Sequence, residues 1–373
     1  MNKKNFKTIV GCILLAFPFM VNAQGPRMQP VESPVVHADH TVTFRFKAPE
    51  AKKVELSCQF MKGNQTLMKD SSGIWSTTLG PVEPDIYPYN FIVDGISVSD
   101  PNNMNVFPNE HFKASLVEIP GEKSAVYSLQ DVPHGEVTYC YYQSKTMKVT
   151  RPLLVYTPPG YQKGDKKYPV LYLISGTTDT EETWFKVGKA NLILDNLIAK
   201  QKARPMIIVM PYGNTLTGTP DPLSLQAAEM YKVFNDDLTG SIIPFVEANF
   251  RAISDRESRA IAGFSRGGGQ TLFAGFTNID KFAWIGSYSA YLTREVFEKY
   301  FKNIYADPEK TNKQLKLLWL GVGNEDFLYK PAIDFIDLLK EKNIKQKSLI
   351  TTGGHTWMNA RHYLTETLQM YFK

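Results

Sequence analysis

Three observations predict an α/β protein with a mostly parallel central sheet, preceded by a small all-β sandwich. From residue 125 onward, short apolar runs alternate with stretches of helical periodicity, as consecutive strand–helix–strand units require. Between residues 30 and 120, short segments alternate apolar and polar side chains, as half-buried antiparallel strands do. The length of 373 residues suits two domains. We expect them over residues 30–120 and 125–373.

The first 23 residues predict a cleaved signal peptide. Lys3, Lys4 and Lys7 precede an apolar run over residues 9–21, and small residues at positions 21–23 offer a cleavage site. The run is too short to span a bilayer, so no stable membrane insertion is expected. The protein is therefore expected to be secreted or periplasmic.

Charge and cysteine content exclude several classes of protein. The formal charge of +5 falls to about +2 when the three signal-peptide lysines are removed, and it is too scattered for a nucleic-acid binder. No His-Glu-x-x-His motif or Cys/His cluster occurs, so neither a metal nor a cofactor is expected. Cys58 shares a strand face with Val54 and Leu56, which predicts a buried free thiol.

The first domain is predicted to contain strands over residues 41–46, 54–60, 73–75 and 87–93, with a tight hairpin at Asp94-Gly95. The pattern Tyr-x-Tyr-x-Phe-x-Val-Asp-Gly over residues 87–95, followed by Asp-Pro-Asn at 100–102, resembles the immunoglobulin-like modules at the N-terminus of starch- and glycogen-active enzymes and of some carbohydrate esterases. Some of these modules bind glycans, which would give Trp75 or Tyr89 a stacking role. The alternative is that both aromatic side chains pack in the core.

The second domain is predicted to contain a series of strands separated by helices. A long helix is expected over residues 182–202, where Ala190, Leu194 and Leu197 recur at helical spacing. Nearly all-apolar strands indicate a sheet covered by helices on both faces. They are expected over residues 149–156, 168–174, 205–211, 259–264, 315–320 and 347–351.

One of these strands ends in Gly263-Phe264-Ser265-Arg266-Gly267, the pattern of a nucleophile elbow. Ser265 would stand on a sharp turn between strand and helix, where side chains at Gly263 and Gly267 would collide with both elements. The N-terminus of the following helix would stabilise negative charge beside the serine. A glycine-rich turn without chemistry is the alternative, unless the rest of the chain supplies partners.

A nucleophilic serine needs a base, which is normally histidine. His355 follows a predicted strand within a Gly353-Gly354 loop, at the end of the sheet where α/β active sites lie. His362 falls inside the last predicted helix and is expected to be partly exposed. His355 is therefore the predicted base.

The acid should lie between the serine and the histidine in the chain. Asp326 comes directly after a predicted strand and is our choice, with Glu325 as the alternative, while Asp334 and Asp337 suit the outer face of the next helix. The oxyanion hole needs two N–H donors. We expect them from the backbone of Arg266 and Thr177.

Across the whole second domain the residues resemble the esterase D group of α/β-hydrolases, specifically carbohydrate esterase family 1, which contains feruloyl and acetylxylan esterases. The resemblance implies an α/β-hydrolase fold, with Ser265, Asp326 and His355 as nucleophile, acid and base. The chain departs from the family where it has Ser175 before Gly176, in place of histidine, and where it has Arg266 in place of a frequent methionine. The matching pieces are residues 134–135, 155–161, 188–191, 194–198, 209–211, 261–270, 278–282 and 354–357.

The resemblance and the expected secretion together predict a serine esterase that removes hydroxycinnamoyl (feruloyl) or acetyl groups from xylan or a related plant polysaccharide. The expected partner is that polysaccharide or its acylated oligosaccharides. Tyr212 and Tyr288, with Arg266, are candidates for substrate contact, and loop packing is the alternative for them. Two other functions stay open: a siderophore or other small-ester esterase, and a carbohydrate-binding protein with a degenerate esterase domain.

Overall fold

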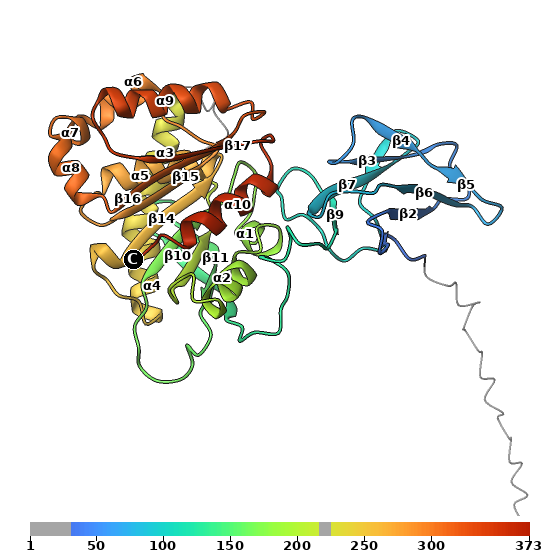
Figure 1. Cartoon of the computed structure of the whole chain (residues 1–373), viewed down its shortest axis with the longest axis horizontal. Helices are drawn as coiled ribbons and strands as arrows, with labels where there is room; N and C mark the ends of the chain where they lie inside the picture. Colours follow the sequence, from blue (N-terminus) through green and yellow to red (C-terminus); the bar gives the residue numbers. More distant parts are fainter. Residues whose placement is uncertain (1–30, 216–224) are drawn as a thin grey trace, which may run out of the picture.

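Two bodies of regular structure follow one another along the chain in this computed structural model, which describes residues 31–215 and 225–373 (Figure 1). An all-β body, residues 35–118, precedes an α/β body, residues 136–368. The predicted signal peptide lies outside the described residues. Within the described ranges, the helices are all too short or too polar to cross a membrane.

The all-β body consists of two antiparallel sheets, with strand orders β1-β2-β6-β5 and β4-β3-β7-β8, and β9 also pairs with β7. Burial alternates along β3, as the apolar–polar alternation predicts. Asp94 and Gly95, both at positive φ, form the predicted hairpin between β7 and β8. The strands are β1 (Val35–Val36), β2 (Val42–Lys47), β3 (Val54–Cys58), β4 (Asn64–Thr66), β5 (Met68–Lys69), β6 (Ile74–Leu79), β7 (Ile86–Val93), β8 (Ile96–Val98) and β9 (Ser115–Glu118).

Aromatic side chains fill the space between these two sheets. The indole of Trp75 donates a hydrogen bond to the carbonyl of Ala48 at 2.8 Å, and the hydroxyl of Tyr89 donates to Asp100 at 2.8 Å. Both rings are buried, so a glycan-stacking role for them is wrong and the core-packing alternative holds. Cys58 is a buried free thiol, as predicted. The resemblance of this body to immunoglobulin-like modules stays a prediction.

The α/β body is built on one sheet of eight strands in the order β10-β11-β13-β12-β14-β15-β16-β17. The pairs β10–β11 and β11–β13 are antiparallel, and every later pair is parallel, which confirms the mostly parallel sheet. Strands β10 and β15 were not predicted. The strands are β10 (Glu136–Ser144), β11 (Val149–Thr157), β12 (Val170–Ile174), β13 (Ile207–Pro211), β14 (Arg259–Phe264), β15 (Trp284–Tyr288), β16 (Leu317–Gly323) and β17 (Lys347–Thr351).

Helices cover both faces of this sheet, each over its own apolar cluster. One face is covered by α1 (Thr183–Lys186), α2 (Ala190–Ala199) and α10 (Trp357–Leu368). Against the other pack α3 (Leu225–Asp237), η1 (Leu238–Ile242), α4 (Ile243–Asn249), α5 (Arg266–Thr277), α6 (Arg294–Tyr300), α7 (Lys302–Tyr305) and α9 (Tyr329–Glu341). The short η2 (Arg256–Ser258) and α8 (Pro308–Gln314) complete the body.

The long helix predicted over residues 182–202 is divided into α1 and α2. Lys189 adopts a left-handed conformation with φ of 53°, which ends the helical path between them. A side chain at Gly188 would collide with the ring and backbone of Trp184. The tight packing of Trp184 against this turn therefore overrides the helical periodicity.

The two bodies share an apolar and charged interface. Ile86, Phe107 and Leu116 join the apolar cluster beneath α10. The guanidinium of Arg361 on α10 is buried, donates to Val187 O at 2.7 Å and forms an ion pair with Asp85 of the all-β body. A buried charge at this position fixes the orientation of α10 against β7, because leaving either partner unpaired would be costly.

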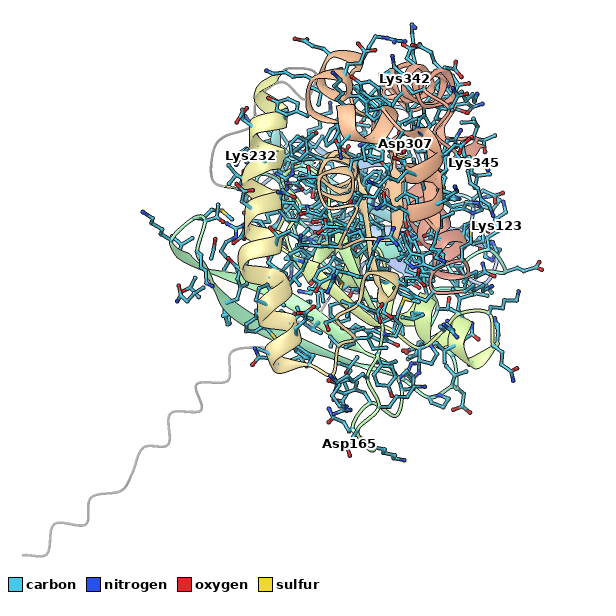
Figure 2. The ribbon with its side chains drawn as sticks, turned by 90° about the vertical axis from the view of Figure 1, so that its left-hand side faces the viewer. Lys123, Asp165, Lys232, Asp307, Lys342 and Lys345 are labelled. Carbon is cyan, nitrogen blue, oxygen red and sulfur yellow. The ribbon has the colours of Figure 1, made fainter. Side chains whose placement is uncertain are left out.

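Charges on the outer surface are mixed in sign. Figure 2 shows Lys123, Asp165, Lys232 and Lys342 at separate places on the molecule. Such pairs as Lys232 with Asp236, 2.6 Å apart, are exposed and contribute little to stability.

Replacing Arg361 with alanine should destabilise the protein, because Asp85 would be left as a buried, unpaired carboxylate. We expect a loss of roughly 3–5 kcal/mol, measured as a lower Tm and a lower free energy of unfolding. Lys123→Ala is the matched control, because Lys123 also forms an ion pair with the all-β body, through Glu83, but both partners of that pair are exposed. A Tm for Arg361→Ala equal to that of Lys123→Ala would contradict the assigned role.

Candidate active site

Ser265 occupies a sharp turn between β14 and α5. Its backbone has φ of 57° and ψ of −124°, a strained conformation for a residue with a side chain. A side chain at Gly263 would collide with the carbonyl of Gly267, and one at Gly267 with the carbonyls of Ile174 and Ser175. The Ser265 N–H donates to Tyr288 O on β15 at 2.8 Å. The geometry is that of the predicted nucleophile elbow.

His355 reaches Ser265 from the loop after β17. Its Nε2 lies 2.8 Å from Ser265 Oγ, within hydrogen-bond distance. The loop is held by Asn359 of α10, whose side-chain amide donates to Gly354 O at 3.0 Å and to Thr352 O at 3.2 Å. The structure therefore brings together two side chains that are 90 positions apart in the chain.

Asp326 completes the chain of hydrogen-bonding groups from the loop after β16. Its two carboxylate oxygens lie 3.0 and 2.9 Å from His355 Nδ1, and one of them accepts the Leu328 N–H at 2.8 Å. Burial opposes ionisation of this carboxyl, but the hydrogen bond from His355 and the electrostatic interaction with its ring outweigh burial and lower the pKa of Asp326. Glu325 is exposed and makes no such contact.

Two aromatic rings hold the imidazole between them. Phe264, the residue before Ser265, stacks on His355 with ring centroids 4.7 Å apart, and the exposed Phe327 lies 4.6 Å away. The side chain of His355 is consequently only 17% exposed. Both phenylalanines adjoin predicted site residues in the chain, yet nothing in the sequence pattern indicates that they meet.

The loop after β12, residues 175–179, lies directly beside Ser265. A β-carbon added to Gly176 would lie 3.4 Å from the Cβ of Ser265. Thr177 is in this loop, and Arg266 begins α5, where helical N–H groups have no intrahelical acceptor. Arg266 therefore directly follows the serine, and Thr177 directly follows the glycine that lies beside it.

A segment of the chain before residue 125 also borders the site, which the sequence did not predict. The Asn109 amide donates to the buried Asp179 at 3.2 Å, and the Glu110 N–H donates to Thr178 O at 2.8 Å. Glu110 also accepts hydrogen bonds from Tyr212 and Asn214. These two hydrogen bonds outweigh the opposing effect of burial and lower the pKa of Glu110.

The two predicted substrate-contact tyrosines differ in position. Tyr288 is wholly buried, with its hydroxyl 2.5 Å from Thr367 Oγ1 and its ring against Trp184, so its expected contact with substrate is wrong. The strand β15 is covered on both faces, and this residue points into the core. Tyr212 is half-buried, with its ring under the Arg151 guanidinium at 4.9 Å. A substrate contact by Tyr212 stays a prediction.

The remaining alternatives for the site lie on the surface. His362 is exposed on α10, as predicted. Asp334 and Asp337 pair with Lys330 and Lys340 on the outer side of α9 and are more than half exposed.

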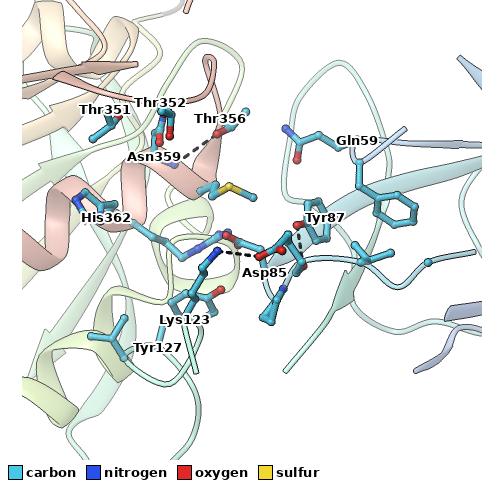
Figure 3. Close-up of a pocket in the computed structure, with 18 of the residues that line it drawn as sticks. Gln59, Asp85, Tyr87, Lys123, Tyr127, Thr351, Thr352, Thr356, Asn359 and His362 are labelled. Carbon is cyan, nitrogen blue, oxygen red and sulfur yellow. Dashed lines mark hydrogen bonds and ion pairs between the residues drawn. The ribbon is translucent and has the colours of Figure 1, made fainter. Parts of the chain in front are cut away.

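A cavity of about 1090 Å³ separates the all-β body from α10 (Figure 3). Thr352 and Thr356, which precede and follow His355, lie in its wall, opposite Gln59 and Tyr87. Ser265 does not line it. The cavity therefore adjoins the loop that carries His355 and extends away from the serine toward the all-β body.

Comparison with known sequences places this arrangement in a family. Residues 144–369 match the esterase family model described as "Putative esterase". The chain is 32% identical over 363 residues to an endo-1,4-beta-xylanase/feruloyl esterase of Xylanibacter ruminicola, an alignment that covers 93% of this chain and 47% of that protein. The chain thus spans about half the length of this curated relative.

Solved structures share the fold. A CE1 ferulic acid esterase from Anaeromyces mucronatus matches with a TM-score of 0.59 and 21% identity, over 68% of this chain and 98% of its own. An enterobactin esterase from Shigella flexneri matches with a TM-score of 0.61 and 17% identity, over 91% of this chain and 94% of its own. The latter match includes part of the all-β body. It covers 91% of this chain, whereas the α/β body, residues 136–368, makes up only 233 of the 373 residues. The chain belongs to the esterase family and has the α/β-hydrolase fold.

Proposed function

We propose that this protein is a serine carboxylic-ester hydrolase in which Ser265, His355 and Asp326 form a catalytic triad. The observation that carries the proposal is the continuous chain of contacts from Ser265 Oγ through the imidazole to a buried carboxylate, at 2.8 and 2.9 Å. A serine hydroxyl is a weak nucleophile at neutral pH, and an adjacent base overcomes this. The family membership supports the same chemistry.

In the first half of the reaction, His355 Nε2 takes the proton of Ser265 as its oxygen attacks the ester carbonyl. The carbonyl oxygen becomes an oxyanion and accepts hydrogen bonds from the Arg266 and Thr177 N–H groups. His355 then gives the proton to the leaving alcohol, and the acyl group stays on Ser265. Water, activated by the same imidazole, hydrolyses this acyl-enzyme and releases the carboxylic acid.

Asp326 acts on the reaction through the imidazole. Its carboxylate accepts a hydrogen bond from Nδ1–H, which leaves Nε2 unprotonated to act as the base, and it stabilises the imidazolium that forms. Its lowered pKa favours the ionised form that this role requires. The Phe264 and Phe327 rings restrict the imidazole to the orientation that this role requires.

For the natural substrate, we propose a hydroxycinnamoyl or acetyl ester on xylan or a related plant polysaccharide. The curated relative whose alignment covers 93% of this chain is named for xylanase and feruloyl esterase activity. The cavity between the all-β body and α10, whose wall includes Thr352 and Thr356 of the His355 loop, offers room for sugar units at a distance from the scissile ester. Such a substrate requires export of the protein, which the predicted signal peptide over residues 1–23 would provide.

The second candidate is an esterase for a siderophore or another small ester. It is favoured by the fold likeness to an enterobactin esterase, which extends over both bodies of the chain. A carbohydrate-binding protein with a degenerate esterase domain is less consistent with the contacts of Ser265, His355 and Asp326, which are complete.

Replacing Ser265 with alanine should abolish ester hydrolysis without unfolding the protein. We expect turnover of a p-nitrophenyl ester to fall by roughly 10³-fold or more, because the nucleophile is removed. The wild type should be labelled by a fluorophosphonate probe and the variant should not. Near-normal turnover in Ser265→Ala, with an unchanged Tm, would refute the assignment.

The activity should rise with pH, because only a neutral imidazole can take the serine proton. Asp326, with its lowered pKa, stays ionised, so the loss of activity in acid reports protonation of the imidazole. We expect kcat/KM to increase between about pH 5 and pH 8, the range in which histidine side chains generally titrate. A flat profile over this range would contradict a histidine base.

A panel of esters separates the candidate substrates. Methyl ferulate, feruloylated and acetylated xylo-oligosaccharides and a catecholate lactone should be compared by kcat/KM. The proposal predicts the highest value for an acylated xylo-oligosaccharide, the substrate class that the name of the curated relative indicates. The highest value for the lactone would favour the siderophore alternative.

A further inference from the structure

Two buried ionisable side chains, Arg266 and Asp179, hold the two peptide groups on either side of Gly176. The Gly176 N–H donates to Asp179 Oδ2 at 3.0 Å. The Gly176 carbonyl accepts from Nη2 of Arg266 at 2.9 Å. Arg266 and Asp179 are 7% and 5% exposed. Both the backbone N–H and the carbonyl of Gly176 are therefore hydrogen-bonded to buried side chains, immediately beside Ser265.

Fixing the Gly176 carbonyl also fixes the direction of the Thr177 N–H. The two groups belong to one planar trans peptide unit and point in opposite directions. The Thr177 N–H has no acceptor among the residues that the structure describes. A rotation of this peptide would therefore turn the carbonyl and the N–H together.

We propose that the Arg266 side chain is a positioning residue of the oxyanion hole, which holds the Gly176 carbonyl so that the Thr177 N–H points at the developing oxyanion. The inference rests on the proposed esterase function. The backbone N–H of Arg266 is itself the other predicted donor. Arg266 thus supplies one donor with its backbone and orients the second, the Thr177 N–H, with its side chain.

Packing alone does not explain why a charged side chain occupies the buried position 266. The Nε and Nη1 atoms of Arg266 are buried without a hydrogen-bond partner among the described residues, an arrangement that costs stability. Burial lowers the pKa of this guanidinium, despite the nearby Asp179 and Glu110. An apolar side chain of similar length would fill the same space at lower cost, but it could not hold a carbonyl oxygen.

The Asp179 carboxylate holds the preceding peptide, between Ser175 and Gly176, and connects the loop to the rest of the molecule. The Asp179 backbone N–H also donates to the Gly176 carbonyl, at 3.4 Å. Oδ1 of the carboxylate accepts from Asn109, and the neighbouring Thr178 carbonyl accepts from the Glu110 N–H. Burial raises the pKa of Asp179 to about 7. The loop is thus held at Gly176, Thr178 and Asp179. Arg266 provides the shorter of the two contacts on the Gly176 carbonyl, which belongs to the peptide that carries the Thr177 N–H.

The test is Arg266→Met in the full chain, because methionine keeps the length of the side chain and removes its donors. We expect kcat for a p-nitrophenyl ester to fall roughly 10- to 100-fold, below the full effect of deleting an oxyanion donor. KM should stay within about twofold, since the contact matters most when the oxyanion forms. The Ki of a trifluoromethyl ketone, which forms such an oxyanion on the serine, should rise by the same factor as kcat falls.

Two further variants separate positioning from a structural role. Arg259→Met is the matched control: Arg259 is also a buried arginine, at the opposite end of β14, and it donates to Lys281 O and pairs with Glu247. It should lower Tm while changing kcat less than twofold. Arg266→Lys retains a donor and should recover part of the lost kcat.

Three outcomes would overturn the proposal. They are an unchanged kcat in Arg266→Met, a loss of kcat with no change in the Ki of the ketone, and equal activities for Arg266→Lys and Arg266→Met. Failure of the proposed function would look different: the wild type itself would neither hydrolyse esters nor react with a fluorophosphonate.

Discussion

The whole site depends on the strained backbone of Ser265. A residue with φ of 57° and ψ of −124° costs of the order of 1–3 kcal/mol and persists only where its surroundings leave no other conformation. Here the crossing of β14, α5 and the end of β12 leaves no room for side chains at Gly263 and Gly267, and the Tyr288 carbonyl holds the Ser265 N–H. The packing of three elements thus presents one hydroxyl at the edge of the sheet.

Parallel strands explain why the partners of that hydroxyl can meet it. The strands β14, β16 and β17 run in the same direction, so the loops after them emerge at the same edge of the sheet. Ser265, Asp326 and His355 each stand in one of these loops. The aromatic rings of Phe264 and Phe327 then limit the freedom of the imidazole, so the contacts at 2.8 and 2.9 Å are formed before substrate arrives.

Charge is used differently inside and outside this molecule. The ion pairs on α9 are exposed to solvent. In contrast, Arg361, Arg266 and Asp179 are buried where two segments of the chain pack together, and their hydrogen bonds fix the relative position of those segments. Arg361 connects α10 to the all-β body, and α10 in turn holds the His355 loop through Asn359. The interface between the bodies and the proposed active site are therefore parts of one packed structure, with the cavity of Figure 3 between them.

The sequence by itself determined the features that depend on local pattern. Alternating and continuous apolar runs revealed most strands, and glycines around Ser265, Asp326 after a strand and His355 in a glycine loop indicated the predicted triad. Only the tertiary structure decided which distant groups meet. Asn109 and Asp179 are 70 positions apart, and Arg266 and Gly176 are 90 apart, so no periodicity links them. It also decided that Tyr288 is buried, because a strand covered on both faces presents no pattern that distinguishes the side chains near a site from those in the core.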